Sequence, residues 1–157
     1  MRKLLILLFL LSFKINAQND TCDIFDVQTD KFKGSTRFYS DTYSGIDFVK
    51  YISKEKVTTH YIALEVIGST LNVGEKGVII LLNDGKINKP LEKIDVDYKD
   101  EGYRYSVLIP LTKQDIEKLK KSRITDFQLY IYEKNVLEGD QLKLLKTFNC
   151  LLQAKIK

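Results

Sequence analysis

Most of the chain alternates apolar and polar residues in short runs that are separated by turn residues. A period of two residues predicts antiparallel β-strands that each bury one face. In the run 58–68 the alternation places Ile62, Leu64 and Val66 on one face, and the run 46–53 precedes it across a short polar loop. These two runs therefore predict a β-hairpin.

Further strands are predicted in the middle of the chain. Residues 77–82 are continuously apolar and rich in β-branched side chains, which predicts a central strand buried on both faces. Asn83-Asp84-Gly85 follows directly, and these residue types tolerate the backbone angles of a tight hairpin turn. A second turn at 99–102 separates the runs 94–98 and 103–109, which we also expect to be strands.

Helical signals appear in the last third of the chain. Thr112, followed three residues later by Asp115, forms a variant of the capping box and predicts a short helix at 113–121. In 142–152 the spacing of the apolar residues favours an amphipathic helix, with a strand as the open alternative. With the strands, these signals predict an α+β fold: mostly antiparallel β, as a sheet or sandwich, with one or two short helices.

The run 124–133 alternates again and predicts one continuous strand with Phe127, Leu129 and Ile131 toward the core. Tyr130 and Tyr132 then share the opposite face. Exposed tyrosines two residues apart on a strand suit stacking on sugars or anchoring a protein partner. We therefore predict Tyr130 and Tyr132 as binding residues. The open alternative is that a helix covers that face and makes both rings part of the core.

The first residues have the parts of a cleavable signal peptide, so we expect 1–17 to be removed on export. Arg2 and Lys3 precede the apolar stretch 4–13, and Ala17 is the small residue that suits cleavage. As a helix this stretch would rise only about 15 Å, half of the roughly 30 Å core of a bilayer. The expected product is a periplasmic or secreted chain, 18–157, with a single β-rich globular domain and no stable membrane insertion.

Two cysteines remain after the predicted cleavage, Cys22 and Cys150. An even pair in an exported chain predicts a disulfide bond, because such compartments are oxidising. A catalytic thiol or a metal pair is the competing interpretation.

The charge of the exported chain argues against a nucleic-acid partner. Loss of Arg2, Lys3 and Lys14 lowers the formal charge from +4 to +1. The other basic residues are scattered among acidic ones, which predicts an ordinary solvated surface with no basic face for a nucleic acid or an anionic membrane.

The remaining polar residues form no catalytic motif. His60 is the single histidine and is in phase with the buried face of its strand, which indicates a strand-edge residue rather than a metal ligand or general base. Asp95, Asp97, Asp100 and Glu101 lie close together, but their spacing departs from that of a calcium loop. We interpret them as a solvated hairpin tip and leave a cation site open. We predict no catalytic residue, metal or cofactor.

Two segments carry a resemblance to other proteins. The stretch 68–80 (GSTLNVGEKGVII) and the stretch 109–116 (IPLTKQDI), which leads through a short helix into a strand like 124–132, resemble small exported bacterial proteins of unknown function. The likeness covers half of the chain after the signal peptide. It implies a shared fold element and a bacterial, exported protein, and it supplies no activity and no functional residues.

These features together predict a non-enzymatic binding or interaction module of the bacterial envelope that uses a β-sheet surface. The expected partner is an unknown protein or carbohydrate. Two alternatives stay open: a periplasmic inhibitor or immunity protein, and a hydrolase that uses carboxylates or His60.

Overall fold

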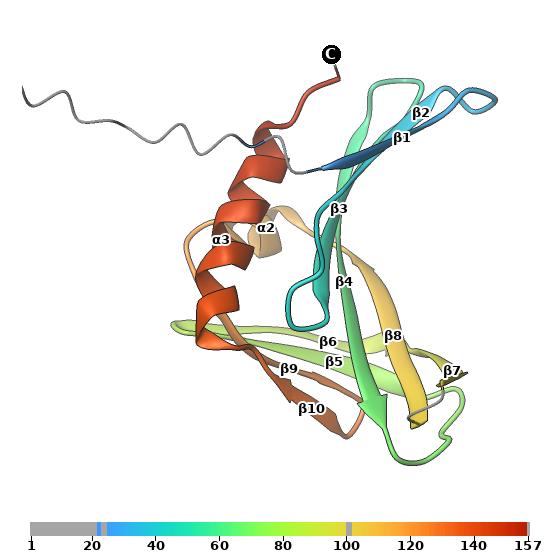
Figure 1. The fold of residues 1–157 in the computed structure, drawn as a ribbon, viewed down its shortest axis with the longest axis vertical. Coiled ribbons are helices and arrows are strands. Elements are labelled where there is room, and N and C mark those ends of the chain that lie inside the picture. The colour runs from blue at the N-terminus through green and yellow to red at the C-terminus, as the bar shows by residue number, and fades with distance from the viewer. Residues whose placement is uncertain (1–21, 23–24, 100–101, 157) are drawn as a thin grey trace, which may run out of the picture.

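The fold consists of two antiparallel sheets and two helices (Figure 1). The computed structural model describes residues 22, 25–99 and 102–156, so the predicted signal peptide lies outside the described residues. One sheet has six strands in the order β1-β2-β3-β4-β8-β7, and the other has four in the order β10-β9-β5-β6. This architecture confirms the predicted α+β class.

The bounds of β3, β4, β5, β7, β8 and α2 follow the predicted runs closely, whereas β1, β2 and β6 correspond to no predicted run. The six-stranded sheet contains β1 (Asp26–Asp30), β2 (Ser35–Tyr39), β3 (Ile46–Ile52), β4 (Thr58–Gly68), β7 (Asp95–Lys99) and β8 (Gly102–Pro110). The four-stranded sheet contains β5 (Lys76–Leu82), β6 (Gly85–Lys93), β9 (Ile124–Leu129) and β10 (Tyr132–Asn135). The helices are α2 (Lys113–Leu119) and α3 (Glu138–Gln153).

The core lies between the inner faces of the two sheets and α3. The alternating residues of β4 are buried on this side, as predicted, and α3 contacts both β3 and β9. Phe148 of α3 is fully buried, and its ring centroid lies 4.7 Å from that of Phe48 on β3. The apolar spacing at 142–152 thus belongs to a helix, and its stripe of Leu144, Phe148 and Leu151 faces the core.

The prediction that β5 is buried on both faces is wrong. Its burial alternates, with Val78, Ile80 and Leu82 buried and Leu81 exposed. The strand is central, since β9 and β6 pair with it on either side. Only one side of β5 faces the core, and the apolar residues of its other side are partly or largely exposed.

The prediction of one continuous strand at 124–133 is also wrong. β9 ends at Leu129, which pairs with Tyr132 of β10, so Tyr130 and Ile131 form a two-residue turn. Tyr130 has a positive φ of 56°, and Ile131 is 58% exposed instead of facing the core. Hairpin turns of this length favour Gly, Asn or Asp, so the residue types here gave no sign of the turn.

The helix α2 begins with the capping box that the sequence predicts. The hydroxyl of Thr112 accepts a hydrogen bond from the backbone N–H of Asp115 at 3.2 Å, and the Asp115 carboxylate accepts one from the N–H of Thr112 at 3.0 Å. Lys89 of β6 also contacts this carboxylate, with 2.7 Å between its Nζ and Oδ2. The cap therefore fixes both the start of α2 and its position beside the four-stranded sheet.

Replacing Thr112 by alanine is expected to lower the free energy of unfolding by about 1 kcal/mol, because it removes the acceptor for a helix-terminal N–H group. Denaturant unfolding measures this loss. Thr112→Ser keeps the hydroxyl and serves as the matched control, which should stay close to the wild type. An unchanged midpoint in the alanine variant would contradict a stabilising cap.

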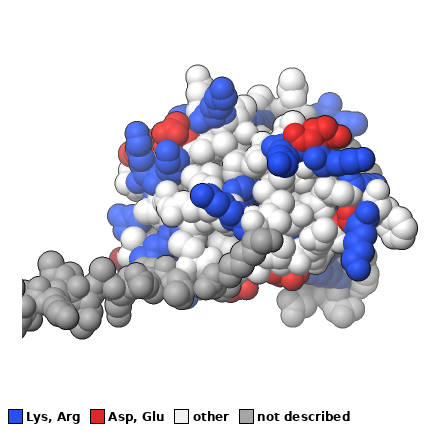
Figure 2. Space-filling view, turned by 90° about the horizontal axis from the view of Figure 1, so that it is seen from above, with Lys and Arg blue, Asp and Glu red and all other residues white. Residues whose placement is uncertain are grey.

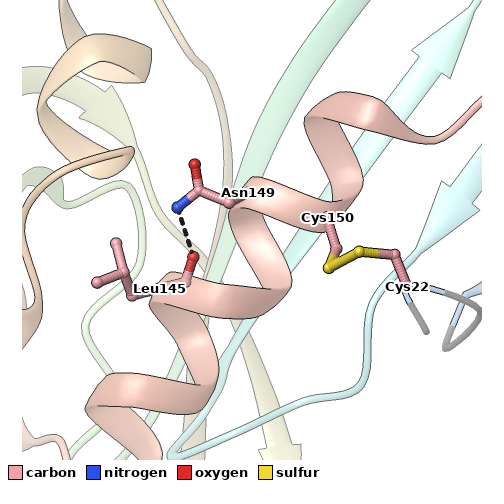
Figure 3. The surroundings of a disulfide bond; sticks show 4 residues. All are labelled: Cys22, Leu145, Asn149 and Cys150. Carbon is pink, nitrogen blue, oxygen red and sulfur yellow. Dashed lines mark hydrogen bonds between the residues drawn. A yellow bond between two sulfur atoms is a disulfide. The ribbon is translucent and has the colours of Figure 1, made fainter. Parts of the chain in front are cut away.

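The predicted disulfide is confirmed and joins the two ends of the described chain. Cys22 bonds to Cys150 in the C-terminal half of α3, with their Cα atoms 5.2 Å apart (Figure 3). The side chain of Asn149, which directly precedes Cys150, donates a hydrogen bond to the carbonyl of Leu145 at 2.9 Å. A disulfide of this kind is favoured by oxidising compartments, as expected for an exported chain.

Candidate functional site

Tyr130 and Tyr132, the predicted binding pair, do not share one exposed face. Tyr132 lies on β10 with its ring 4.6 Å from that of the fully buried Tyr105, and its hydroxyl accepts a hydrogen bond from the N–H of Thr70 at 3.1 Å. Tyr130 lies in the turn and packs against the edge of the core. The alternation that placed both rings outside is broken by the turn, so these contacts favour a packing role. Their binding role stays a prediction.

The histidine His60 lies on the inner face of β4, opposite Lys50 of β3. The ammonium of Lys50 is buried at the C-terminal end of α3, where it donates hydrogen bonds to the carbonyls of Leu151, Leu152 and Ala154 at 3.3, 3.1 and 2.7 Å. Lysine at this place satisfies carbonyl groups that a helix leaves unpaired. Burial lowers the pKa of Lys50, and burial together with Lys50 lowers the pKa of His60. The hydrogen bonds of Lys50 thus connect β3 to the C-terminal end of α3.

Acidification is expected to destabilise the fold through His60. Its pKa in the folded chain lies below the ordinary 6.5, so the unfolded chain binds this proton more readily. The free energy of unfolding should therefore fall as the pH drops through 6.5 toward the lower folded pKa. Denaturant unfolding at pH values from about 8 to about 5 measures the slope, which His60→Gln should reduce. Identical slopes in the two proteins would contradict this assignment.

The acidic cluster of the sequence is described only in part, because Asp100 and Glu101 lie outside the described residues. Asp95 and Asp97 lie on β7 and face the same side, as predicted. Arg104 of β8 forms an ion pair with Asp97. Among the described residues, no three His, Cys, Asp or Glu side chains are grouped as a metal site requires.

A different surface combines aromatic and polar groups: the side of the six-stranded sheet that faces away from α3 and the four-stranded sheet, which we call the outer face. Figure 1 shows no described helix or strand covering it. The strand register places the following side chains on it: Arg37, Tyr39, Asp47, Val49, Tyr51, Tyr61, Ala63, Glu65, Asp95, Asp97, Arg104, Ser106, Leu108 and Pro110.

One half of the outer face is aromatic. Tyr39, Val49 and Tyr61 are paired neighbours across β2, β3 and β4. Val49 is only 7% exposed although it points away from the core. Cross-strand neighbours on a sheet lie within contact distance, so Tyr39 and Tyr61 are placed to cover Val49 from either side. The guanidinium of Arg37 lies 5.8 Å from the ring centre of Tyr51 and adds a cationic edge.

The other half of the outer face is acidic and hollowed. A depression of about 300 Å³ is lined by Asp47, Ala63, Glu65, Asp95, Ser106 and Leu108, among other residues. Burial raises the pKa of Asp47, and the neighbouring charge of Glu65 raises it further. Glu65 itself is held by Lys99, with 3.0 Å between Nζ and Oε1, and by Arg104 at 3.7 Å. The hollow therefore offers fixed carboxylate and hydroxyl groups beside the aromatic half.

This surface could hardly be predicted from the sequence. Tyr39, Tyr51 and Tyr61 belong to three separate runs, and only the pairing of β2, β3 and β4 brings them together. Asp47 is likewise distant in sequence from Asp95, and β4 and β8 lie between their strands. The alternation in each run does show which residues leave the core, but the strand order is needed to assemble them.

None of the described helices has the length and apolarity needed to cross a bilayer. Compared with protein-family models, with curated protein sequences and with solved structures, the chain shows no match to any of them.

Proposed function

We propose that this protein is an exported, non-enzymatic binding module of the bacterial envelope that holds a neutral or amino-sugar carbohydrate on its outer face. The observation that carries this proposal is the tyrosine row over Val49, on a sheet face that no described element covers. Tyrosines held in this way offer apolar ring surface together with hydroxyl groups.

The polar half of the outer face supports a sugar as the ligand. Sugar rings present C–H groups that can rest on aromatic side chains, and hydroxyl groups that need hydrogen-bond partners. The hollow supplies the carboxylate of Asp47 in the cross-strand row next to that of Val49 and Tyr61, and the carboxylate of Asp95 and the hydroxyl of Ser106 one row farther. Hydrogen bonds to charged groups are among the stronger ones, so a few of them can fix the orientation of a ligand.

The charges support a ligand that is not anionic. Asp47, Glu65, Asp95 and Asp97 lie on this face. Arg104 and Lys99 neutralise Glu65 and Asp97 through the ion pairs described above. The carboxylates of Asp47 and Asp95 would repel an acidic sugar, so a neutral or amino sugar fits best.

The test measures the affinity of the protein for two hexasaccharides, cellohexaose and the N-acetylglucosamine hexamer, by isothermal titration calorimetry. Replacing Tyr51 and Tyr61 together by alanine should weaken binding by about tenfold or more, because aromatic anchors dominate interface energies. Tyr98→Ala is the matched control, since Tyr98 is an exposed tyrosine on the opposite face of the same sheet and should leave binding unchanged.

Two outcomes would count against the proposal. If the Tyr51/Tyr61 variant binds the hexamers as tightly as the wild type, the outer face is not the binding site. Loss of binding in a Tyr130/Tyr132 double alanine variant that keeps its fold would return the site to the turn after β9.

A second candidate is a carbohydrate hydrolase that uses the same face. The observation that favours it is the carboxyl of Asp47, which has a raised pKa and lies near Glu65, because paired carboxyls with different pKa values serve as acid and base in glycosidases. Release of shorter sugars from the two hexamers by wild type but not by Asp47→Asn would select the hydrolase. Binding of the hexamers without release of shorter sugars would favour the non-enzymatic binding module.

A further inference from the structure

One end of the molecule gathers lysines that are far apart in the sequence. The turn between β1 and β2, the turn between β3 and β4, and the tail after α3 all lie at the end that is uppermost in Figure 1. The first two turns touch, because the side chain of Lys54 lies within 3.4 Å of the position a Cβ would take on Gly34. We call this the lysine-rich end, and its basic residues are Lys31, Lys33, Lys54, Lys56 and Lys155.

The view from above shows this end rimmed with basic side chains (Figure 2). The acidic residues on the same turns are Asp30 and Glu55. The carboxylate of Asp30 is hydrogen-bonded within its own turn: it accepts from the N–H groups of Phe32 and Lys33 at 2.9 and 3.0 Å. The end as a whole is therefore cationic, although the sequence predicts no basic face.

Each of the three segments also exposes an apolar side chain beside its lysines. Phe32 is fully exposed between Lys31 and Lys33 at the tip of its turn. Val57 follows Lys56 and is 61% exposed, and Ile156 follows Lys155 and is 58% exposed. None of the three belongs to the core, so the fold does not explain why apolar residues occupy these places.

An apolar groove of about 750 Å³ lies between β1, β2 and the tail after α3, and Ile156 is one of the residues that line it. Val27 and Phe38 contribute from the strands, and Ile156 and Lys155 contribute from the tail. The lysine-rich end thus combines exposed apolar tips, an apolar recess and a cationic rim.

We propose that the lysine-rich end docks on an anionic phospholipid surface, with the lysines at the headgroups and Phe32, Val57 and Ile156 in the outer part of the acyl layer. Peripheral membrane binding needs these two components, because basic residues are attracted to anionic headgroups and apolar side chains enter the interface. Charge complementarity selects the partner, and the apolar tips distinguish a lipid surface from a soluble polyanion. The strands β3, β4 and β8 run along the long axis of the molecule, so the acidic hollow of the outer face lies away from the docked end.

The test uses the absence of tryptophan from the sequence. Phe32→Trp introduces a single fluorescent reporter at the tip, and Leu91→Trp places the same reporter at another exposed apolar position, on β6. Both variants are made as the predicted exported chain, 18–157, so that the apolar stretch 4–13 adds no vesicle binding of its own. Vesicles of phosphatidylcholine with phosphatidylglycerol, and vesicles of phosphatidylcholine alone, are the probes.

We expect the emission of Phe32→Trp to shift to the blue with phosphatidylglycerol vesicles and not with phosphatidylcholine alone, while Leu91→Trp shifts with neither. In a flotation assay, reversal of four lysines to glutamate should reduce recovery with the anionic vesicles by about tenfold or more, since each basic residue adds to the attraction. The reversed residues are Lys31, Lys33, Lys54 and Lys56. The matched control reverses Lys76, Lys86, Lys93 and Lys113, which gives the same net charge.

Three results would overturn the proposal. The first is an unshifted Phe32→Trp spectrum with anionic vesicles, and the second is an equal loss of flotation in the two reversal variants. The third is binding to a single-stranded oligonucleotide that the vesicles do not compete away, which would identify a nucleic acid as the partner.

Discussion

Replacing Cys150 by serine is expected to lower the free energy of unfolding by about 2–5 kcal/mol, the usual effect of removing a native disulfide from a small exported domain. The bond links residues separated by 128 positions, so it restricts nearly the whole unfolded chain. It also fastens the start of the described chain to α3, whose inner stripe is part of the core. Denaturant unfolding under non-reducing conditions measures the loss.

Cys22→Ser should give the same loss, and the double variant should be no less stable than either single variant, because all three lack the same bond. Wild-type protein in a reducing buffer should match them. If the wild-type midpoint is the same with and without reductant, the disulfide does not stabilise the fold and the first prediction fails.

Truncation of Phe148 to alanine is expected to cost about 3–5 kcal/mol, the range for a buried aromatic residue. Its ring is fully buried against Phe48 and joins α3 to the six-stranded sheet. The surrounding strands are held by their own ladders and cannot close the cavity that the ring would leave.

Leu142→Ala is the matched control for this change, because Leu142 lies on the exposed side of the same helix. It should change the free energy of unfolding by less than about 1 kcal/mol. Similar losses from Phe148→Ala and Leu142→Ala would show that α3 is not anchored through its inner stripe.

Elements whose patterns have local causes could be predicted from the sequence, whereas β1, β2 and β6 could not. The cap of α2 depends on Thr112 and Asp115 alone, and the inner face of β4 follows from alternation within one run. The turn at Tyr130 and Ile131 was missed because neither residue is a typical turn former, and its positive φ is imposed by the surrounding hairpin. Tertiary packing overrides local preference at this point.

The candidate surfaces could not be predicted, because they arise from pairings between distant segments. The aromatic half of the outer face needs the register of β2, β3 and β4, and the lysine-rich end needs two turns and the tail to lie at the same end of the molecule. The net charge of the sequence combines the acidic residues of the outer face with the basic residues of the lysine-rich end, so it reveals neither surface. The structure separates them into an acidic hollow on one face and a cationic rim at one end.

The most direct test of the proposed binding function is a map of backbone amide shifts in a nuclear magnetic resonance titration with the N-acetylglucosamine hexamer. The proposal predicts that the largest shifts fall on residues of the outer face, centred on Tyr51, Tyr61 and Leu108, and that β9 and β10 are unaffected. Shifts centred on Tyr130 and Tyr132, or no shifts at millimolar hexamer, would contradict it.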